Sequence, residues 1–438
     1  MTLPAPEVPK ETQFDLLSRY RSVRAETEQL ATPLSAEDMQ IQSMADASPT
    51  KWHLAHTTWF YETFILRELN PQYRVFDPRY HEIFNSYYHS LGQPFSRPLR
   101  GLLSRPSIDE IYAYRAYVDR AISTVLQGGG EERRLNNLVL LGLNHEQQHQ
   151  ELLLTDIKHA LSINPLLPAY INNADAGSGE NGQKVEALEW IAVNGGIFNI
   201  GASAGGDQAN EGDNFCFDNE TPSHPLLVQD FRIASRLVTN GEFLEFIEDG
   251  GYRQHRLWLS DGWSWVNTHS VQHPHYWRRV DGSWQQFTLC GLQPLAYAEP
   301  VCHLNFYEAD AFATWAGFRL PTEFEWEVAA CQLCTPDDLA AANLLEKRHW
   351  HPAASHQQRQ LLGDVWEWTS SAYQPYPGFR ASGDAVGEYN GKFMCNQKVL
   401  RGGSCVTPSS HIRSSYRNFF YPHQFWQFTG IRLAGDAL

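Results

Sequence analysis

The chain has 438 residues, of which 42% are hydrophobic and 13% aromatic, so a disordered chain is excluded and two or three packed cores are expected. Its net charge is -16, from 34 basic and 50 acidic residues, and this balance would repel a nucleic-acid backbone. No segment approaches the ~20 apolar residues of a membrane span and the N-terminus lacks a signal-peptide pattern, so we expect a cytoplasmic protein that acts on small molecules.

The first part of the chain reads as a helical bundle. Periodic apolar residues predict five helices, over residues 14–31, 35–46, 52–69, 107–126 and 131–160. An irregular excursion over 70–106 separates the third of these helices from the fourth. Loops held on a rigid scaffold often carry ligand-binding residues, so we expect this excursion to contribute to a site.

A polar, glycine-containing segment over 172–184 has the composition of a linker. After it the pattern changes to short extended runs with many aromatics and few helices, among them 240–249 and 306–316, which indicates an α+β domain. We therefore predict a bundle over 10–170, a linker over 171–185 and a second domain over 186–438. The seven cysteines are odd in number and confined to the second half, unlike a disulfide framework, and the lone pair Cys331 and Cys334 is best explained by chance spacing.

Two histidines four residues apart are the strongest chemical signal. His145 and His149 lie one turn apart on the helix predicted over 131–160, so both imidazoles can reach one metal ion. The same letters, HEQQH, also match the HExxH signature of zinc peptidases, in which the glutamate, here Glu146, is the general base. The spacing alone leaves both chemistries open.

A second histidine cluster offers a third ligand. His53 and His56 lie in the helix predicted over 52–69, and the apolar stripe of that helix places His56 inward and His53 nearer its edge. Three neutral imidazoles leave coordination positions open, which suits a catalytic metal better than a closed structural one. We therefore predict that His56, His145 and His149 bind one metal ion.

The chain resembles a known two-domain family. The second half is similar to formylglycine-generating, sulfatase-modifying domains with a C-type-lectin-like fold, through the motifs GGIF at 195–198, DNETP at 218–222, GFRLPTEFEWE at 317–327, GDVWEWT at 363–369, LRGGS at 400–404 and GIR at 430–432. The first half resembles a DinB-like four-helix bundle with a three-histidine metal site. This pairing is the arrangement of ergothioneine-pathway sulfoxide synthases.

The resemblance implies a mononuclear non-haem iron(II) enzyme that uses dioxygen to join a thiol to the imidazole C2 of hercynine, Nα-trimethylhistidine, as a sulfoxide. His56, His145 and His149 would hold the iron. Gln148 and Asn418 would hold the hercynine imidazole, because an amide pair can meet both ring nitrogens. Asn418 and Phe419 stand in a segment similar to the family's RN-aromatic motif. Lectin-like domains sometimes hold calcium, so Ca²⁺ in the C-terminal domain belongs to the same expectation.

Departures from the family bear on the sulfur donor. Members that use γ-glutamylcysteine carry an Asp and an Arg shortly after the motif asparagine, where this chain has Phe420 and Gln424 or Phe425, and their catalytic tyrosine has only Tyr389 as a counterpart here. The branch that uses free cysteine has a tyrosine pair in the bundle's long loop, matched by Tyr87 and Tyr88, the implied catalytic residues. A phenol can supply a proton or an electron to the reaction.

Within this branch, Arg97 and Arg100 would bind the carboxylate of the thiol substrate. Packing of Tyr87 and Tyr88 between domains and surface salt bridges of the two arginines are the alternatives. Cysteine is thus the expected donor. The loss of amino-acid-binding charges leaves a selenosugar donor, as in the related selenoneine synthase, as the alternative.

Three other classes of protein remain open to test. A zinc peptidase would need Glu146 to face the metal, and a formylglycine-generating enzyme would need a cysteine pair near 414–417, where the chain has none. A non-catalytic binding module is the third class, since lectin-like folds often only bind. Metal content separates these classes, because iron favours the synthase, zinc the peptidase and no metal the binding module.

Overall fold

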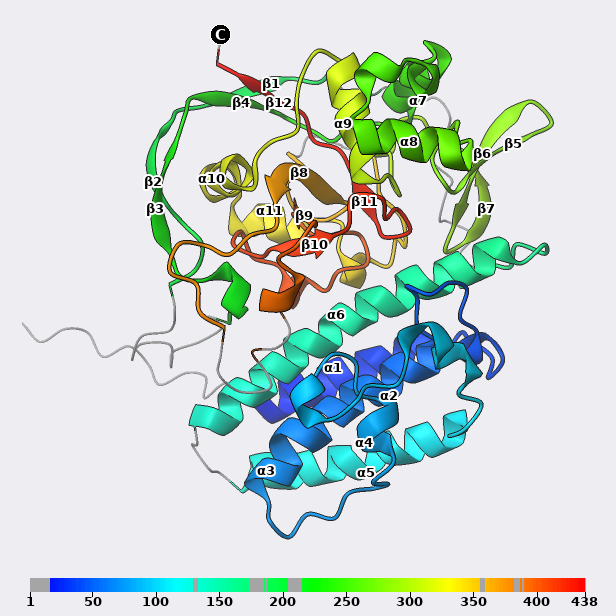
Figure 1. Cartoon of the computed structure of the whole chain (residues 1–438), viewed down its shortest axis with the longest axis vertical. Helices are drawn as coiled ribbons and strands as arrows, with labels where there is room; N and C mark the ends of the chain where they lie inside the picture. Colours follow the sequence, from blue (N-terminus) through cyan, green and yellow to red (C-terminus); the bar gives the residue numbers. More distant parts are fainter. Residues whose placement is uncertain are drawn as a thin grey trace, which may run out of the picture.

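A computed structural model describes residues 16–128, 133–172, 185, 187–203, 215–354, 359–381, 387 and 390–437. Figure 1 shows a helical N-terminal half and a mixed C-terminal half on opposite sides of one long helix, α6 (Arg133–Ile163). Residues 173–184 of the predicted linker and Tyr389 lie outside the described residues, so the domain limits drawn from the sequence stay a prediction. No helix in these ranges is long and apolar enough to cross a membrane.

Four long helices form the N-terminal half, as the sequence predicts. They are α1 (Leu16–Ala31), α2 (Thr50–Tyr61), α5 (Ile108–Gln127) and α6, and α2 continues through a π-helical turn (Glu62–Leu66) into α3 (Arg67–Leu69). A capping box between Ser107 and Glu110 starts α5. Glu62 in the π-helical turn accepts hydrogen bonds from the hydroxyls of Tyr73 and Tyr114, at 2.7 Å each, which ties the excursion and α5 to this turn.

The helix predicted over 35–46 is wrong. The segment makes one short 3-10 turn (Asp38–Gln40) and then runs extended. Its glutamines explain the difference, because Gln40 Nε2 donates to the carbonyl of Gly101 at 2.6 Å and the amide of Gly101 donates to Gln42 Oε1 at 2.6 Å. Contacts with a distant loop thus replace the hydrogen bonds of a local helix.

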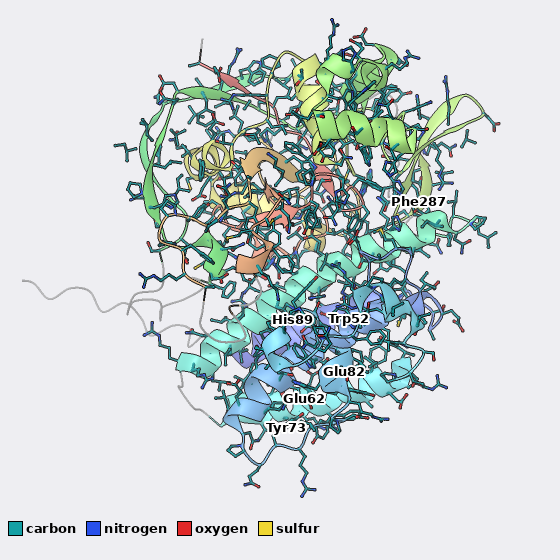
Figure 2. All side chains as sticks on the ribbon, in the orientation of Figure 1. Trp52, Glu62, Tyr73, Glu82, His89 and Phe287 are labelled. Atoms are coloured by element: carbon teal, nitrogen blue, oxygen red, sulfur yellow. The ribbon has the colours of Figure 1, made fainter. Side chains whose placement is uncertain are left out.

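The excursion between α3 and α5 has little regular structure. It contains the short helix α4 (Tyr80–Ile83) and two 3-10 turns (His89–Leu91 and Arg97–Leu102). The Trp52 side chain, which Figure 2 places inside the bundle, donates from Nε1 to the carbonyl of Ile83 at 3.1 Å. The excursion is therefore fastened onto α2, the helix that carries His56.

The C-terminal half is α+β, as expected. Its four small sheets have the orders β1-β4-β12, β2-β3, β5-β6-β7 and β10-β9-β8-β11. The strands are β1 (Trp190–Val193), β2 (Gly196–Ile200), β3 (His224–Val228), β4 (Phe231–Ala234), β5 (Trp277–Val280), β6 (Ser283–Thr288), β7 (Gly291–Pro294), β8 (Trp366–Ala372), β9 (Lys398–Arg401), β10 (Asn418–Phe420), β11 (Thr429–Gly430) and β12 (Ala434–Asp436). Pairing of β12 with β4 brings the last strand of the chain back to the start of this half, whose sheets Figure 1 shows on the far side of α6 from the bundle.

Short helices pack around these sheets. They are α7 (Asn240–Glu248), α8 (Ser260–His269), α9 (Phe306–Trp315), α10 (Glu323–Leu333) and α11 (Pro336–Ala341). The helices expected over 240–249 and 306–316 are therefore present. All seven cysteines are free thiols, as expected for a chain without a disulfide framework.

The two halves share one core. A single cluster of buried side chains includes Trp59 and Leu154 from the bundle together with Val406 and Phe428 from the C-terminal half. Polar contacts join the halves as well, because Glu151 on α6 accepts hydrogen bonds from Trp366 Nε1 at 2.5 Å and Thr407 Oγ1 at 2.6 Å. One side of α6 thus belongs to the bundle and the other to the C-terminal half.

Candidate metal centre

Three histidines converge between α2 and α6. His56 comes from α2, and His145 and His149 stand one turn apart on α6. One ring nitrogen from each lies within 4.8 Å of the others, and His56 and His145 are buried while His149 is half-buried. Among the described residues, this is the one group of three or more His, Cys, Asp or Glu side chains with such geometry. The structure therefore assembles the predicted triad.

Hydrogen bonds leave ring nitrogens available for a metal. His56 Nδ1 lies 2.6 Å from the carbonyl of Phe84, so Nδ1 carries the proton and Nε2 keeps its lone pair. His149 Nδ1 lies 2.8 Å from His53 Nδ1, which leaves His149 Nε2 for the metal. His145 Nδ1 is buried, and no described residue forms a hydrogen bond with it.

The environment keeps these imidazoles neutral. Burial lowers the pKa of His145 to about 3 and holds the pKa values of His56 and His149 well below their ordinary value, with the neighbouring histidines adding to the effect. Neutral imidazole is the form that binds metal ions. A set of three nitrogen donors with open positions fits a catalytic first-row metal, iron(II) among them.

Glu146 cannot serve as the base of a zinc peptidase. It is fully buried and points into the bundle, where Arg24 Nη1 donates to Oε2 at 3.0 Å and Arg115 Nη2 donates to Oε1 at 3.2 Å. A carboxylate held by two guanidinium groups is not available to activate water at the triad. The sequence therefore matches the HExxH motif by chance, and the glutamate of the match is part of the bundle core.

Gln148 points from α6 to the C-terminal half. Its Nε2 donates to Tyr416 Oη at 2.8 Å, and its buried Oε1 has no hydrogen-bond partner in the described part of the chain. Tyr416 Oη also lies 3.1 Å from His411 Nε2, and His411 Nδ1 lies 2.9 Å from Asn144 Oδ1. The structure thus places Gln148 beside the segment that carries Asn418, although no hydrogen bond joins the two amides within the described residues.

Asn418 begins β10 and its Oδ1 accepts a hydrogen bond from the amide of Phe419 at 2.8 Å. The ring of Phe419 is stacked on Tyr373, with centroids 4.2 Å apart. Neither side chain is fully buried. The Asn418 amide nitrogen and the exposed edge of Phe419 therefore remain available to a ligand.

The neighbouring tyrosines Tyr87 and Tyr88 of the excursion have different surroundings. Tyr88 is 3% exposed and its ring packs on Trp59, with centroids 5.6 Å apart, while Trp59 stacks on His56. Tyr87 is half-buried and packs edge-on against Phe393 of the C-terminal half, at 5.0 Å. Tyr88 thus lies on the metal side of the loop and Tyr87 at the junction of the halves.

Arg97 and Arg100 of the excursion face the same region. Arg97 Nη1 donates to Tyr87 Oη at 3.1 Å. Arg100 is 2% exposed, donates to the hydroxyls of Ser48 and Ser86 at 2.9 and 3.0 Å, and lies 3.4 Å from the centre of the Trp52 ring. Burial lowers the pKa of Arg100 to about 9, and the nearby charge of Arg97 adds to the effect. Arg100 is therefore no surface salt bridge.

The sequence interpretation underestimated His53. It placed His53 at the edge of a buried stripe, but His53 is 2% exposed because α2 packs against α1, α5 and α6 and is buried along its whole length. The spacing of His53 and His56, three residues apart on one face of the helix, could have indicated that His53 is buried beside His56. Tyr416 and His411 were missed because nothing in their local sequence shows that they meet α6.

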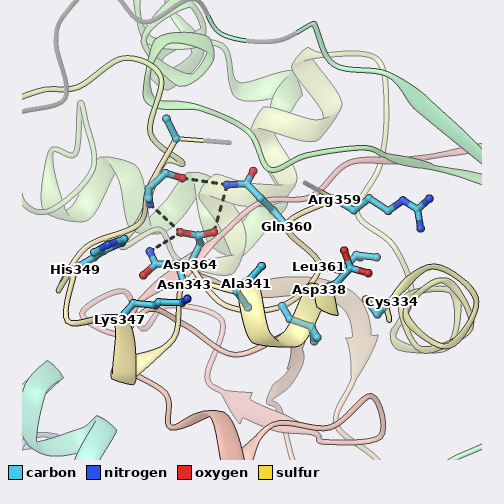
Figure 3. Close-up of a pocket in the computed structure, with 14 residues that line it drawn as sticks. Cys334, Asp338, Ala341, Asn343, Lys347, His349, Arg359, Gln360, Leu361 and Asp364 are labelled. Atoms are coloured by element: carbon cyan, nitrogen blue, oxygen red, sulfur yellow. Dashed lines mark hydrogen bonds between the residues drawn. The ribbon is translucent and has the colours of Figure 1, made fainter. Parts of the chain in front are cut away.

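A cavity of about 340 Å³ lies in the C-terminal half, away from these residues (Figure 3). Asp364 in its wall accepts hydrogen bonds from Asn343 Nδ2 at 2.7 Å, the amide of Ala353 at 2.8 Å and Gln360 Nε2 at 3.3 Å. None of the site residues predicted from the sequence lines it. The Asp364 carboxylate therefore holds a loop in place. We do not assign the functional site to this cavity.

Comparisons with known proteins match a family model to each half of the chain. Residues 19–153 match the model of the DinB superfamily, and residues 177–437 match the sulfatase-modifying factor enzyme 1-like domain. The chain is 33% identical to the hercynine oxygenase of Mycolicibacterium smegmatis over 89% of this chain and 91% of that one. It is 31% identical to the hercynine oxygenase of Mycobacterium tuberculosis, with the same coverage. Among solved structures, PvdO from Pseudomonas aeruginosa is 16% identical over 58% of this chain and all of that chain, with a TM-score of 0.36.

Proposed function

The chain belongs to the family of the hercynine oxygenases, and from this premise we propose that it is a non-haem iron(II), dioxygen-dependent sulfoxide synthase that joins the thiol of cysteine to the imidazole C2 of hercynine. The observation that carries the proposal is the position of Gln148, one residue before His149, with a buried Oε1 that has no hydrogen-bond partner among the described residues. An imidazole N–H of hercynine would supply the donor that this oxygen lacks.

Iron(II) bound by His56, His145 and His149 would supply the activation of dioxygen and hold the sulfur donor. The protein's own side chains fix the two substrates. Gln148 and Asn418 hold the imidazole by its two nitrogens, and Tyr416, which accepts a hydrogen bond from Gln148, orients that amide. Binding the ring at both nitrogens directs C2 to one place, which converts an encounter of two substrates into a reaction between positioned atoms.

The excursion supplies the groups for the second substrate. Arg100 is a buried cation with hydroxyl partners, so a carboxylate would gain a charge-assisted hydrogen bond there. Arg97, near Tyr87, is a second cation for the same group. Tyr88, packed on Trp59 beside His56, is the phenol placed to hold and deliver a proton during the reaction.

A selenosugar is the second candidate donor, with selenoneine synthesis as the activity. The observation in its favour is Phe425, an apolar residue whose ring packs on His275 with centroids 4.5 Å apart, in the segment that carries charge in relatives using γ-glutamylcysteine. The lack of a charge at this position disfavours the γ-glutamyl donor.

The test is product formation by the full chain loaded with iron(II). We expect an aerobic mixture with hercynine and cysteine to yield a hercynine–cysteine sulfoxide by mass spectrometry, and parallel mixtures with γ-glutamylcysteine and a selenosugar identify the donor. His145→Ala should abolish the product. His159→Ala is the matched control, because His159 is a buried histidine of the same helix that contacts Ser43 and His275 instead of the triad. Absence of any hercynine adduct with all three donors would refute the proposal.

A further inference from the structure

The proposed metal ligand His149 is the first member of a hydrogen-bonded chain that runs from α6 to α2 and back to α6. His149 Nδ1 lies 2.8 Å from His53 Nδ1, and His53 Nε2 lies 3.2 Å from Asp156 Oδ2. Asp156 Oδ1 then accepts a hydrogen bond from Trp426 Nε1 at 3.2 Å, and the amide of Ser48 donates to Oδ2 at 2.8 Å. We call His149, His53 and Asp156 the His–His–Asp chain, and Trp426 is its contact with the C-terminal half.

The direction of the protons in this chain follows from the metal. If His149 binds through Nε2, its Nδ1 must carry the proton, so Nδ1–H donates to His53 Nδ1. His53 then has its own proton on Nε2, and this N–H donates to the Asp156 carboxylate. Every hydrogen bond therefore points from the metal ligand to the carboxylate, and no ring needs a charge.

We propose that His53 and Asp156 are positioning residues that fix the tautomer and orientation of His149, and that Trp426 makes this arrangement depend on the docked C-terminal half. The inference rests on the proposed metal site and extends it. A carboxylate that accepts from a metal-bound imidazole raises the donor strength of that ligand. Here a second histidine carries the effect of Asp156 to His149.

Burial protects the hydrogen bonds of the His–His–Asp chain from water. His53 is 2% exposed and Asp156 is 6% exposed, so water does not compete for these hydrogen bonds. Trp426 is 5% exposed and belongs to the segment that follows β10. Because Asp156 receives one donor from α2, one from the segment before α2 and one from the C-terminal half, three parts of the molecule set its position.

A purely structural role makes a different prediction. If the His–His–Asp chain only satisfied the hydrogen bonds of buried polar groups, its loss would lower the stability of the protein but leave the metal affinity of the folded protein unchanged. If it positions His149, metal affinity falls and the ligand field changes even in variants that fold. Metal binding therefore separates the two roles without any enzyme assay.

The experiment titrates the metal-free full chain with Co²⁺, whose visible absorption reports coordination geometry. Asp156→Asn keeps the shape but removes the charge, and His53→Leu removes the acceptor for His149. We expect both to weaken Co²⁺ binding by roughly 10- to 100-fold and to change the visible spectrum. His53→Asn should recover part of the affinity, since its Oδ1 can take the place of Nδ1, and Trp426→Phe should show a smaller loss.

Matched variants control for packing. His159→Asn alters a buried histidine of α6 outside the chain, and Trp368→Phe removes an indole N–H that donates to the carbonyl of Leu304 at 2.9 Å. Both should bind Co²⁺ as the unmodified protein does. Wild-type affinity and spectrum in Asp156→Asn and His53→Leu would overturn the proposal. The titration contains no hercynine, so it tests the role of the His–His–Asp chain separately from the reaction. If the variants bind Co²⁺ as expected but the unmodified protein makes no hercynine adduct, only the proposed function is refuted.

Discussion

Gln147 and Gln148 are neighbours on α6, yet their side chains have different surroundings. Among the described residues neither Oε1 has a hydrogen-bond partner, but Gln147 Nε2 donates to Ser410 Oγ at 2.7 Å, whereas Gln148 stands next to His149 and its Nε2 donates to Tyr416 Oη at 2.8 Å. We expect Gln148→Leu to lower kcat/KM for hercynine by roughly 10- to 100-fold, because one hydrogen bond to the imidazole is lost. Steady-state kinetics with varied hercynine measures this, and Gln147→Leu is the control that should change kcat/KM little. Equal losses in both variants would contradict the assignment.

Glu146 belongs to the core of the bundle, so its removal should affect stability. Glu146→Gln leaves Arg24 and Arg115 without their shared carboxylate, and breaking a buried ion pair in this way costs about 3–5 kcal/mol. Urea unfolding followed by circular dichroism measures the loss. The exposed pair of Glu68 with Arg134 supplies the control, since Glu68→Gln should change the free energy of unfolding by less than about 1 kcal/mol. A fully stable Glu146→Gln protein would contradict this account.

At the scale of single elements, the N-terminus of α9 holds a buried carboxyl group with a shifted pKa. Glu308 accepts hydrogen bonds from Tyr252 Oη at 2.5 Å and the amide of Asn305 at 3.0 Å, and burial raises its pKa to about 7. The folded protein therefore binds a proton that the unfolded chain releases between about pH 4.5 and 7. The free energy of unfolding should fall as pH rises through this window, by at most about 3 kcal/mol.

Glu308→Gln removes this titration. The difference in unfolding free energy between this variant and the unmodified protein should therefore change between about pH 5 and about pH 8, in favour of the variant at the higher pH. Chemical unfolding at both values measures it. Glu245→Gln, on the exposed side of α7, is the control. A constant difference for Glu308→Gln across this range would show that the group does not titrate there.

The elements also show where local sequence patterns suffice. The periodicity that predicted α1, α5 and α6 reflects an apolar face on each of these helices, whereas α2 is buried along its whole length. The spacing of His145 and His149 follows from the helical turn itself. The segment over 35–46 has a similar pattern but forms only a short 3-10 turn, because Gln40 and Gln42 bond to Gly101, which is remote in the sequence. Local patterns cannot include such a contact, so the prediction failed there.

The same limit applies to the site. The triad could be predicted because its members lie on two periodic helices, and Gln148 because of its place beside His149. The contacts of Trp426 with Asp156 and of Tyr416 with Gln148 join residues more than 260 positions apart. Only the docking of the two halves brings them together.

At the scale of the whole molecule, the shared core and the contacts of Glu151 predict that the two halves unfold as one unit. Two of the 14 tryptophans, Trp52 and Trp59, lie in the bundle, so near-ultraviolet circular dichroism reports mainly the C-terminal half, whereas the 222 nm signal is dominated by the long helices. Because one buried cluster includes residues of both halves, we expect the two thermal transitions to coincide.

Thr407→Val tests this coupling at the interface. The variant lacks the hydroxyl that donates to Glu151 Oε2, and a buried carboxylate short of one donor costs about 1–3 kcal/mol. Both circular dichroism transitions should therefore move to lower temperature together. Thr124→Val, on the exposed side of α5, is the control and should shift neither. Should the near-ultraviolet transition move while the 222 nm transition stays in place, the halves would be independent, and an influence of Trp426 on His149 would then have to be local, through Asp156 alone.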